Sequence, residues 1–301
     1  MIRRPPRSTL SSSSAASDVY KRQDRDHVDR ILSLDVIDRD TISRARITAA
    51  IDCVNGAGSR IVPLLLGELG VDVEELYTDV DSPFPHDPEP RPANLAELAA
   101  LVARSDADIG FACDPDADRL VLVDGSGTVL SEELTLALAA DFVLGKEKGP
   151  IVVNLSTTRR IDDVAARHGV AIFRSKVGEA NVIGLMKEKG AVIGGEGNGG
   201  VIYPKVHRGR DAMTGIALVL QYVASTGKSI GDLASGLPDY SGVKEKISFE
   251  GSFDALAKRL RETFDGDYNE LDGIRIDMDE GWIHVRRSNT CLLYTSPSPR
   301  D

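Results

Sequence analysis

Three aspartates lie two residues apart within one short stretch of the chain. Asp114, Asp116 and Asp118 occupy positions i, i+2 and i+4, and Pro115 keeps the backbone between the first two out of a helix. An extended segment points such side chains to one side. There, three carboxylates repel one another unless a cation lies among them. Hard oxygen ligands of this kind suit Mg²⁺, so the stretch predicts a magnesium site in a loop; the alternative is a solvated turn.

Two other kinds of site use closely spaced aspartates. An EF-hand loop that began at Asp114 would need glycine at its sixth position and glutamate at its twelfth, and those positions hold Arg119 and Gly125. The EF-hand is therefore excluded. A phosphatase that forms an aspartyl-phosphate also carries an Asp-x-Asp loop after a strand, and this alternative stays open on the loop alone.

The flanks of the aspartate loop predict the elements that must position it. Residues 107–113 and 120–124 are mostly apolar, which is typical of buried strands. A carboxylate loop at a strand end is where α/β proteins place their chemistry. Before it we expect a helix over 26–46, a strand over 47–54, a glycine turn that serves close packing at 55–58, a helix over 59–69, and a helix capped by Asn94.

A second candidate site lies in a glycine-rich stretch from Gly194 to Gly200. Five of its seven residues are glycine, so Glu196 and Asn198 are the only side chains with polar reach. A carboxylate and an amide can together recognise vicinal hydroxyls, as a sugar presents them. The alternative is a glycine-rich hairpin with exposed polar tips. Arg208 and Arg210 follow shortly afterwards, and either could hold a phosphate.

The aspartate loop resembles the metal loop of the α-D-phosphohexomutases, which move phosphate between C1 and C6 of a hexose. Three further segments resemble that family in the same order: His86–Pro90 before the metal loop, Gly194–Gly200 as the sugar-binding loop, and Arg286–Thr290 as the start of the phosphate-binding loop. Within the family, the glycine-rich segment looks most like that of archaeal phosphoglucosamine mutases. The resemblance implies a small-molecule hexose phosphate as substrate and Mg²⁺ as cofactor. It also implies a mechanism that passes through a phosphoserine.

The resemblance also implies roles for individual residues. The metal ligands would be Asp114, Asp116 and Asp118, and Arg119 would add a catalytic positive charge. The substrate would be bound by Gly178, Glu179, Glu196, Asn198 and Arg210, and the phosphate that is not transferred by Arg286, Ser288, Asn289 and Thr290. The chain departs from the family at Lys176, where relatives tend to have proline. It also has Glu179 and Gly200 where some relatives have histidine, so no general base is assigned.

The fold class implied by the resemblance is α/β, with two three-layer α/β/α domains on mixed sheets and a truncated α+β domain at the C-terminal end. We expect the end of a preceding domain or a linker helix at 23–45, the domains at 46–147 and 148–238, and the truncated domain at 239–290, with a strand over 244–249. Residues 1–22, which show no helical or strand period, and 291–301 read as non-native flanks.

The serine that carries phosphate in this family lies in an earlier domain, in a loop like Thr-Ala-Ser-His-Asn-Pro, and the chain has no such stretch. We therefore expect these 301 residues alone not to catalyse the mutase reaction. A non-catalytic module that binds metal and sugar phosphate, or a magnesium-dependent aspartyl phosphatase, are the alternatives.

Composition narrows the class of protein further. Apolar residues make up 42% of the chain, and no apolar run reaches the length of a membrane span. A formal net charge of −11 argues against general nucleic-acid binding. The three cysteines lack the spacing of a disulfide framework or a zinc site, which indicates reduced thiols in a cytoplasmic protein. The oligomeric state does not follow from the sequence.

Overall fold

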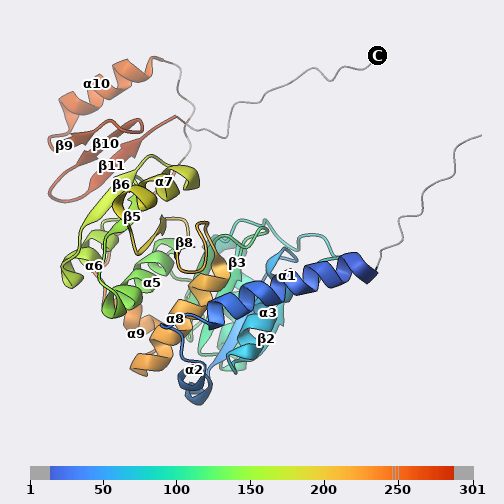
Figure 1. Ribbon diagram of the computed structural model, residues 1–301. Helices are drawn as coiled ribbons and strands as arrows, with labels where there is room; N and C mark the ends of the chain where they lie inside the picture. The colour runs from blue at the N-terminus through green and yellow to red at the C-terminus, as the bar shows by residue number, and fades with distance from the viewer. Residues whose placement is uncertain (1–13, 246, 248, 250, 288–301) are drawn as a thin grey trace, which may run out of the picture.

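The structure is a computed structural model, and it describes residues 14–245, 247, 249 and 251–287, with side chains from residue 22 onward. These residues form two α/β units and a small third module at one end of the molecule (Figure 1). The α/β fold class predicted from the sequence, with mixed sheets and a C-terminal antiparallel module, is confirmed. None of the helices in the described part combines the length and the apolar character that a membrane crossing requires.

The first unit is built on a four-stranded sheet in the order β2-β1-β3-β4. It contains β1 (Thr48–Asp52), β2 (Asp72–Leu76), β3 (Ile109–Cys113) and β4 (Leu120–Asp124). β1, β2 and β3 are parallel, whereas β4 runs antiparallel to β3. Nearly every side chain of β1, β3 and β4 is buried, as expected for strands covered by helices on both faces.

The second unit repeats this topology. Its sheet has the order β6-β5-β7-β8, with β5 (Ile151–Asn154), β6 (Ile172–Ser175), β7 (Ile193–Glu196) and β8 (Gly200–Ile202), and only β8 is antiparallel. Each sheet thus ends in an antiparallel hairpin. The connection of the first hairpin is the aspartate loop, and the connection of the second is the tip of the glycine-rich stretch, so the two candidate sites occupy equivalent places.

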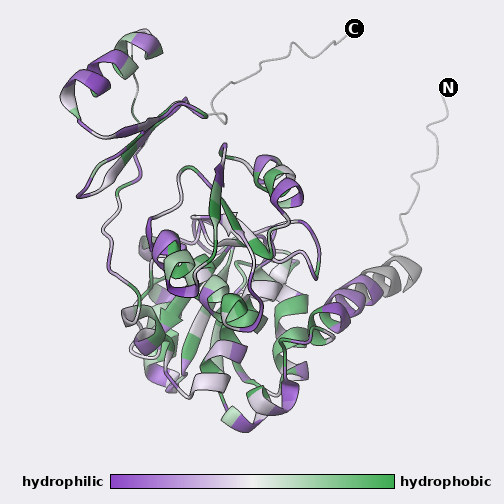
Figure 2. Ribbon diagram, turned by 60° about the vertical axis from the view of Figure 1, so that its left-hand side comes forward, coloured by the Kyte–Doolittle hydropathy of each residue, from purple (hydrophilic) through white to green (hydrophobic). Residues whose placement is uncertain are grey.

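Two buried helices join the units. α5 (Glu132–Lys146) follows β4, and its residues from Leu134 to Leu144 are all buried. A helix that is apolar all round belongs inside a protein. α5 packs on β4 of the first sheet and on β7 and β8 of the second, and it also contacts α8 (Ala212–Thr226). One hydrophobic cluster therefore runs through both units (Figure 2).

The remaining helices cover the outer faces. They are α1 (Ser14–Leu32), α2 (Arg39–Ala45), α3 (Gly58–Glu68), the short 3-10 helix η1 (Pro92–Asn94), α4 (Ala96–Ser105), α6 (Arg160–His168), α7 (Glu179–Lys189) and α9 (Ile230–Ser235). α1 lies beside α3 and α8 (Figure 1).

The third module is an antiparallel sheet with one helix. It consists of α10 (Phe253–Thr263), β9 (Asp267–Asn269), β10 (Ile274–Asp277) and β11 (Trp282–Val285), in the order β11-β10-β9. Arg275 attaches it to the second unit: its guanidinium is buried, donates to the carbonyl oxygens of Leu155 and Thr157, and lies 4.3 Å from the centre of the Trp282 ring.

The structure corrects two expectations near the N-terminus. The single helix expected over 26–46 is two helices, and α1 already begins at Ser14, within the stretch for which no helical period was predicted. The chain breaks between them because Asp38 caps α2, with its side chain accepting a hydrogen bond from the backbone of Thr41.

Two further expectations are wrong. Asn94 does not cap a helix: it ends the 3-10 helix, and its side chain donates to the carbonyl oxygen of Glu89 at 2.8 Å, while α4 begins at Ala96. No strand forms at residues 244, 245, 247 and 249, the described part of the predicted strand over 244–249. Lys244 instead forms ion pairs with Glu132 and Glu133 at the start of α5.

Because the two units share a core, damage to the middle layer should destabilise both together. We expect Ile216→Ala in α8, where the side chain is fully buried, to lower the free energy of unfolding by about 2–5 kcal/mol. Val80→Ala, at a side chain that is 49% exposed, is the control and should change it by less than about 0.5 kcal/mol. Urea unfolding measures the loss. Amide exchange that released β1 well before β5 would contradict the shared core.

Candidate functional site

The aspartate loop is folded around the carboxylate of its first member. Asp114 is buried, and its Oδ1 accepts hydrogen bonds from the backbone nitrogens of Asp118 at 3.1 Å and Arg119 at 3.0 Å. Its Oδ2 accepts from Nε of Arg119 at 2.5 Å. Ala117 takes a positive φ of 56°, which turns the chain back toward β4. One carboxylate oxygen from each of Asp114, Asp116 and Asp118 lies within 4.8 Å of the others.

Three neighbouring segments hold this loop in place. The carbonyl oxygen of Pro115 accepts from the backbone of Ala57 at 2.8 Å, and a Cβ on Gly56 would lie only 2.6 Å from the same oxygen. The glycine turn at 55–58 therefore serves close packing. On the other sides, the carbonyl oxygen of Ala117 accepts from the backbone of Ala212 at 3.1 Å, and the backbone of Leu120 donates to Gly199 at 3.1 Å.

The glycine-rich stretch places Glu196 at the end of β7, where it is almost completely buried. Its Oε1 accepts from the side chain of Asn154 at 2.7 Å and from the backbone of Gly178 at 3.0 Å. Gly178 has a φ of 114°, which a residue with a side chain rarely adopts. Asn198 lies at the tip of the hairpin, where its side-chain oxygen accepts from the backbone of Gly200 at 3.3 Å.

Arg210 connects the two loops. One end of its guanidinium donates to Oε2 of Glu196 at 2.8 Å, and the other end is hydrogen-bonded to Oδ2 of Asp118. Its backbone nitrogen donates to Oε1 of Glu179 at 2.7 Å. The Arg210 side chain passes directly over Gly200, where any Cβ would collide with it. The structure thus brings the predicted metal ligands and the predicted substrate residues to one place.

The electrostatics of the aspartate loop are unfavourable without a cation. Burial, aided by the charges of Asp114 and Asp116, raises the pKa of Asp118 to about 7, although the charge of Arg210 acts in the opposite direction. Oδ1 of Asp118 is buried and has no hydrogen-bond partner among the described residues. A buried carboxylate oxygen without a donor, close to two other carboxylates, is the arrangement that a hard divalent cation satisfies. The residues present therefore fit Mg²⁺.

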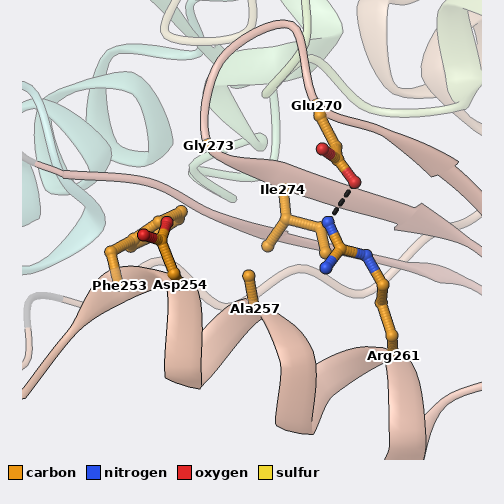
Figure 3. Close-up of a pocket in the computed structure, with 7 residues that line it drawn as sticks. All are labelled: Phe253, Asp254, Ala257, Arg261, Glu270, Gly273 and Ile274. Atoms are coloured by element: carbon orange, nitrogen blue, oxygen red, sulfur yellow. Dashed lines mark hydrogen bonds and ion pairs between the residues drawn. The ribbon is translucent and has the colours of Figure 1, made fainter.

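The predicted phosphate-binding residues are only partly described. Arg286 follows β11, and its guanidinium donates to the carbonyl oxygen of Arg287. Ser288, Asn289 and Thr290 lie outside the described residues. A pocket in the third module, between α10 and β10, contains none of the predicted site residues (Figure 3). Arg261 and Glu270, two of the residues that line it, form an ion pair.

One residue at the site was missed by sequence reasoning. Nζ of Lys244 lies 2.7 Å from the carbonyl oxygen of Gly197 and pairs with Glu132 at 2.7 Å and Glu133 at 3.0 Å. It thereby ties the segment after the second unit to the tip of the glycine-rich hairpin. Alternation of residue types around Lys244 favoured a strand, and no local pattern reveals a partner more than a hundred residues away.

Gly199 should be sensitive to any side chain. It has a φ of 90°, and a Cβ would collide with the backbone of Leu120, so Gly199→Ala should push the two loops apart. We expect this variant to lose at least about tenfold in Mg²⁺ affinity by isothermal titration calorimetry. Gly227→Ala is the matched control, because Gly227 also has a positive φ, of 64°, but no atoms near the added Cβ. Equal Mg²⁺ affinities of the two variants would contradict the steric coupling of the loops.

The raised pKa of Asp118 predicts a pH dependence of stability. The folded protein holds this proton up to about pH 7, whereas the unfolded chain releases it near 3.8, so the contribution of Asp118 to stability falls as pH rises across that window. Asp118→Asn should remove this part of the fall, on the order of a few kcal/mol, in metal-free buffer. Thermal unfolding of both proteins from pH 4 to 8 measures it. Mg²⁺ should stabilise the unaltered protein most at the upper end, and an identical pH profile of the two proteins would refute the assignment.

Comparison with known proteins agrees with this geometry. A family model described as phosphoglucomutase/phosphomannomutase, alpha/beta/alpha domain II, matches residues 25–127, and the corresponding model for domain III matches residues 131–240. A solved phosphoglucomutase/phosphomannomutase family protein from Burkholderia thailandensis superposes with a TM-score of 0.74 at 29% identity, over 88% of this chain and 57% of that one.

Curated relatives point the same way. A protein of Methanopyrus kandleri, named probable phosphoglucosamine mutase, is 36% identical over 88% of this chain and 59% of its own length. A phosphoglucomutase/phosphomannomutase of Thermococcus kodakarensis is 37% identical over 84% of this chain and 57% of its own length. The chain thus spans less than two thirds of either relative. From the match of both domain models and of these relatives, the chain belongs to the phosphoglucomutase/phosphomannomutase family of phosphohexomutases.

Proposed function

We propose that the chain forms the metal-binding and sugar-binding part of an enzyme that moves phosphate between C6 and C1 of a hexose phosphate, with glucosamine-6-phosphate and glucosamine-1-phosphate as the preferred pair. The observation that carries the proposal is the bridge through Arg210, which places Asp118 of the aspartate loop beside Glu196 of the glycine-rich stretch. The enzyme has to bind the phosphoryl group at the metal and, beside it, the hydroxyls of the same sugar. An aspartate loop next to the glycine-rich stretch would do this.

In this proposal Asp114, Asp116 and Asp118 hold Mg²⁺, which would neutralise charge on the phosphoryl oxygens during transfer. Arg119 is oriented for a second positive contact. Its Nε is fixed on Asp114, while Nη1 lies 3.6 Å from Glu89, and the side chain keeps 23% of its surface exposed. A guanidinium held by one nitrogen in this way can direct its other donors at a phosphate.

The sugar would bind at the glycine-rich hairpin. Among the described residues, Oε2 of Glu196 accepts one hydrogen bond, from Arg210, which leaves it a lone pair for a sugar hydroxyl. The side-chain amide group of Asn198 lies at the hairpin tip and could donate to a neighbouring hydroxyl. Gly178 and Glu179 complete the surface, because both are hydrogen-bonded to this group of residues.

The rest of the reaction is also proposed from the family. It would pass through a phosphoserine and a bisphosphorylated sugar, with the phosphate that is not transferred held by the segment from Arg286 to Thr290. Phosphorylated hexoses are made and consumed in the cytoplasm, so we propose this compartment as the place where the protein works.

The aspartyl phosphatase is the weaker alternative. Its nucleophile would be an aspartate with a free carboxylate oxygen. Both oxygens of Asp114 already accept hydrogen bonds from Asp118 and Arg119, which lowers their nucleophilicity. Asp116 is exposed, but it follows the end of β3 by three residues rather than directly.

The metal assignment predicts that Asp116→Asn weakens Mg²⁺ binding by at least about tenfold, because Asp116 is an exposed carboxylate whose loss should leave the fold intact. Asp279→Asn, at an exposed position in the third module, is the control of equal charge change. Titration calorimetry with Mg²⁺ measures both. Unchanged affinity in Asp116→Asn would exclude the aspartate loop as the metal site.

The sugar assignment predicts that Asn198→Ala weakens binding of glucose 1,6-bisphosphate, in saturating Mg²⁺, by about five- to tenfold, which corresponds to one hydrogen bond. Asn269→Ala is a matched control, since Asn269 likewise accepts a hydrogen bond from the backbone two residues later. Mg²⁺ affinity should be the same in both variants. Steady release of inorganic phosphate from the bisphosphate would favour the phosphatase. Equally tight binding of the bisphosphate by Asn198→Ala and the unaltered protein would show that the hairpin is not part of the sugar site.

A further inference from the structure

Three metal-ligating side chains that the proposed function does not use meet at the start of α8, directly after Arg210. His27 comes from α1, His207 from the loop before α8, and Asp211 is the N-cap residue of α8. Nε2 of His27 lies 3.0 Å and Nε2 of His207 lies 3.2 Å from the same oxygen, Oδ2 of Asp211. One ligand atom from each of the three residues lies within 4.8 Å of the others.

The carboxylate in this cluster is rigidly placed. Asp211 is buried, its Oδ1 accepts from the backbone of Met213 at 3.0 Å, and its Oδ2 accepts from the hydroxyl of Thr214. The two histidines and this cap hold the pKa of Asp211 well below its ordinary value despite burial, so the group is a carboxylate. A fixed anion of this kind is a preformed ligand.

The two imidazoles are accessible as well as convergent. Their side chains keep 24% and 37% of their surface exposed, so an ion can reach them from solvent. The rings are tilted by 55° with their centres 5.5 Å apart, and therefore do not stack on each other. Donor atoms of a tetrahedral zinc site lie about 3.3 Å apart, because Zn–N and Zn–O bonds are about 2.0–2.1 Å. The observed separations from Oδ2 of Asp211 are already near this value.

The donor set also selects the type of metal. Two neutral imidazoles and one carboxylate suit Zn²⁺, Co²⁺ or Ni²⁺, whereas three carboxylates suit Mg²⁺. A comparison within the chain shows what is special here. His168 also pairs with a buried aspartate, Asp141, at 2.7 Å, but the other partners of that carboxylate are Arg167 and Tyr222, which cannot serve as ligands in the same way.

We propose that His27, His207 and Asp211 form a second metal site, which binds a divalent transition-metal ion of the zinc type with a fourth position left to water. The ion takes the place of the protons on Nε2 that now face Oδ2 of Asp211, and each neutral imidazole then carries its single proton on Nδ1. It links α1 to the start of α8, one residue from Arg210. The site is thus separate from the aspartate loop but adjacent to the residue that joins the loop to the sugar site.

The test is Zn²⁺ binding to the full chain in a large excess of Mg²⁺, which keeps the aspartate loop filled. We expect one Zn²⁺ per chain, measured by competition with a chromogenic chelator. His27→Gln and His207→Gln should each weaken this binding by more than about tenfold. His168→Gln, which alters a histidine–aspartate pair that lacks a second histidine, should leave it unchanged. Asp116→Asn should also leave it unchanged, which separates this site from the aspartate loop.

Two further measurements keep the proposal falsifiable if a variant folds poorly. Co²⁺ added to the unaltered protein should give the intense visible absorption of a four-coordinate ion, and Zn²⁺ should raise the unfolding temperature of the unaltered protein but not of His207→Gln. Zn²⁺ binding that survives both histidine substitutions, or that disappears in Asp116→Asn, would overturn the proposal. So would the absence of Zn²⁺ binding to the unaltered protein in excess Mg²⁺.

Discussion

The arrangement of this protein depends on one guanidinium placed between two acidic groups. Asp118 and Glu196 come from different sheets and would repel each other at this distance, and Arg210 makes their proximity favourable by bonding to both. A charge-assisted pair of this kind fixes direction as well as distance. Because the carboxylates belong to the two hairpin connections, the same side chain sets the position of one loop relative to the other.

The repeated topology explains why the loops meet. In each unit the third strand pairs with an antiparallel fourth strand, β3 with β4 and β7 with β8. The candidate site residues lie in or beside the turn between the two strands. The backbone bond from Leu120 to Gly199 then joins one turn to the other directly. Glycine at 199 and 200 is required by these close approaches, one to the Leu120 backbone and one to the Arg210 side chain. The composition of the sugar loop therefore reflects packing as well as ligand recognition.

Sequence reasoning worked where a signal is local. The run Leu120–Asp124 is β4 with the same bounds, since four consecutive apolar residues are a strong signal for a buried strand. The aspartate spacing, likewise, is a local pattern and describes a real cluster. It failed where partners are remote: the ties from Lys244 to Glu133 and from Arg210 to Asp118 span about a hundred residues, and no periodicity encodes them. The start of α1 was also missed, because residues 14–22 show no apolar period that would indicate a helix.

The helix that the two sheets share limits how this protein can be dissected. α5 is buried along most of its length and largely apolar, and each unit supplies only part of its cover. If the chain were cut between the units, each half would expose a wide apolar surface to water and would tend to aggregate. Neither half would be an independent building block. Because α5 packs on both sheets, we expect the two turns to keep their positions relative to each other.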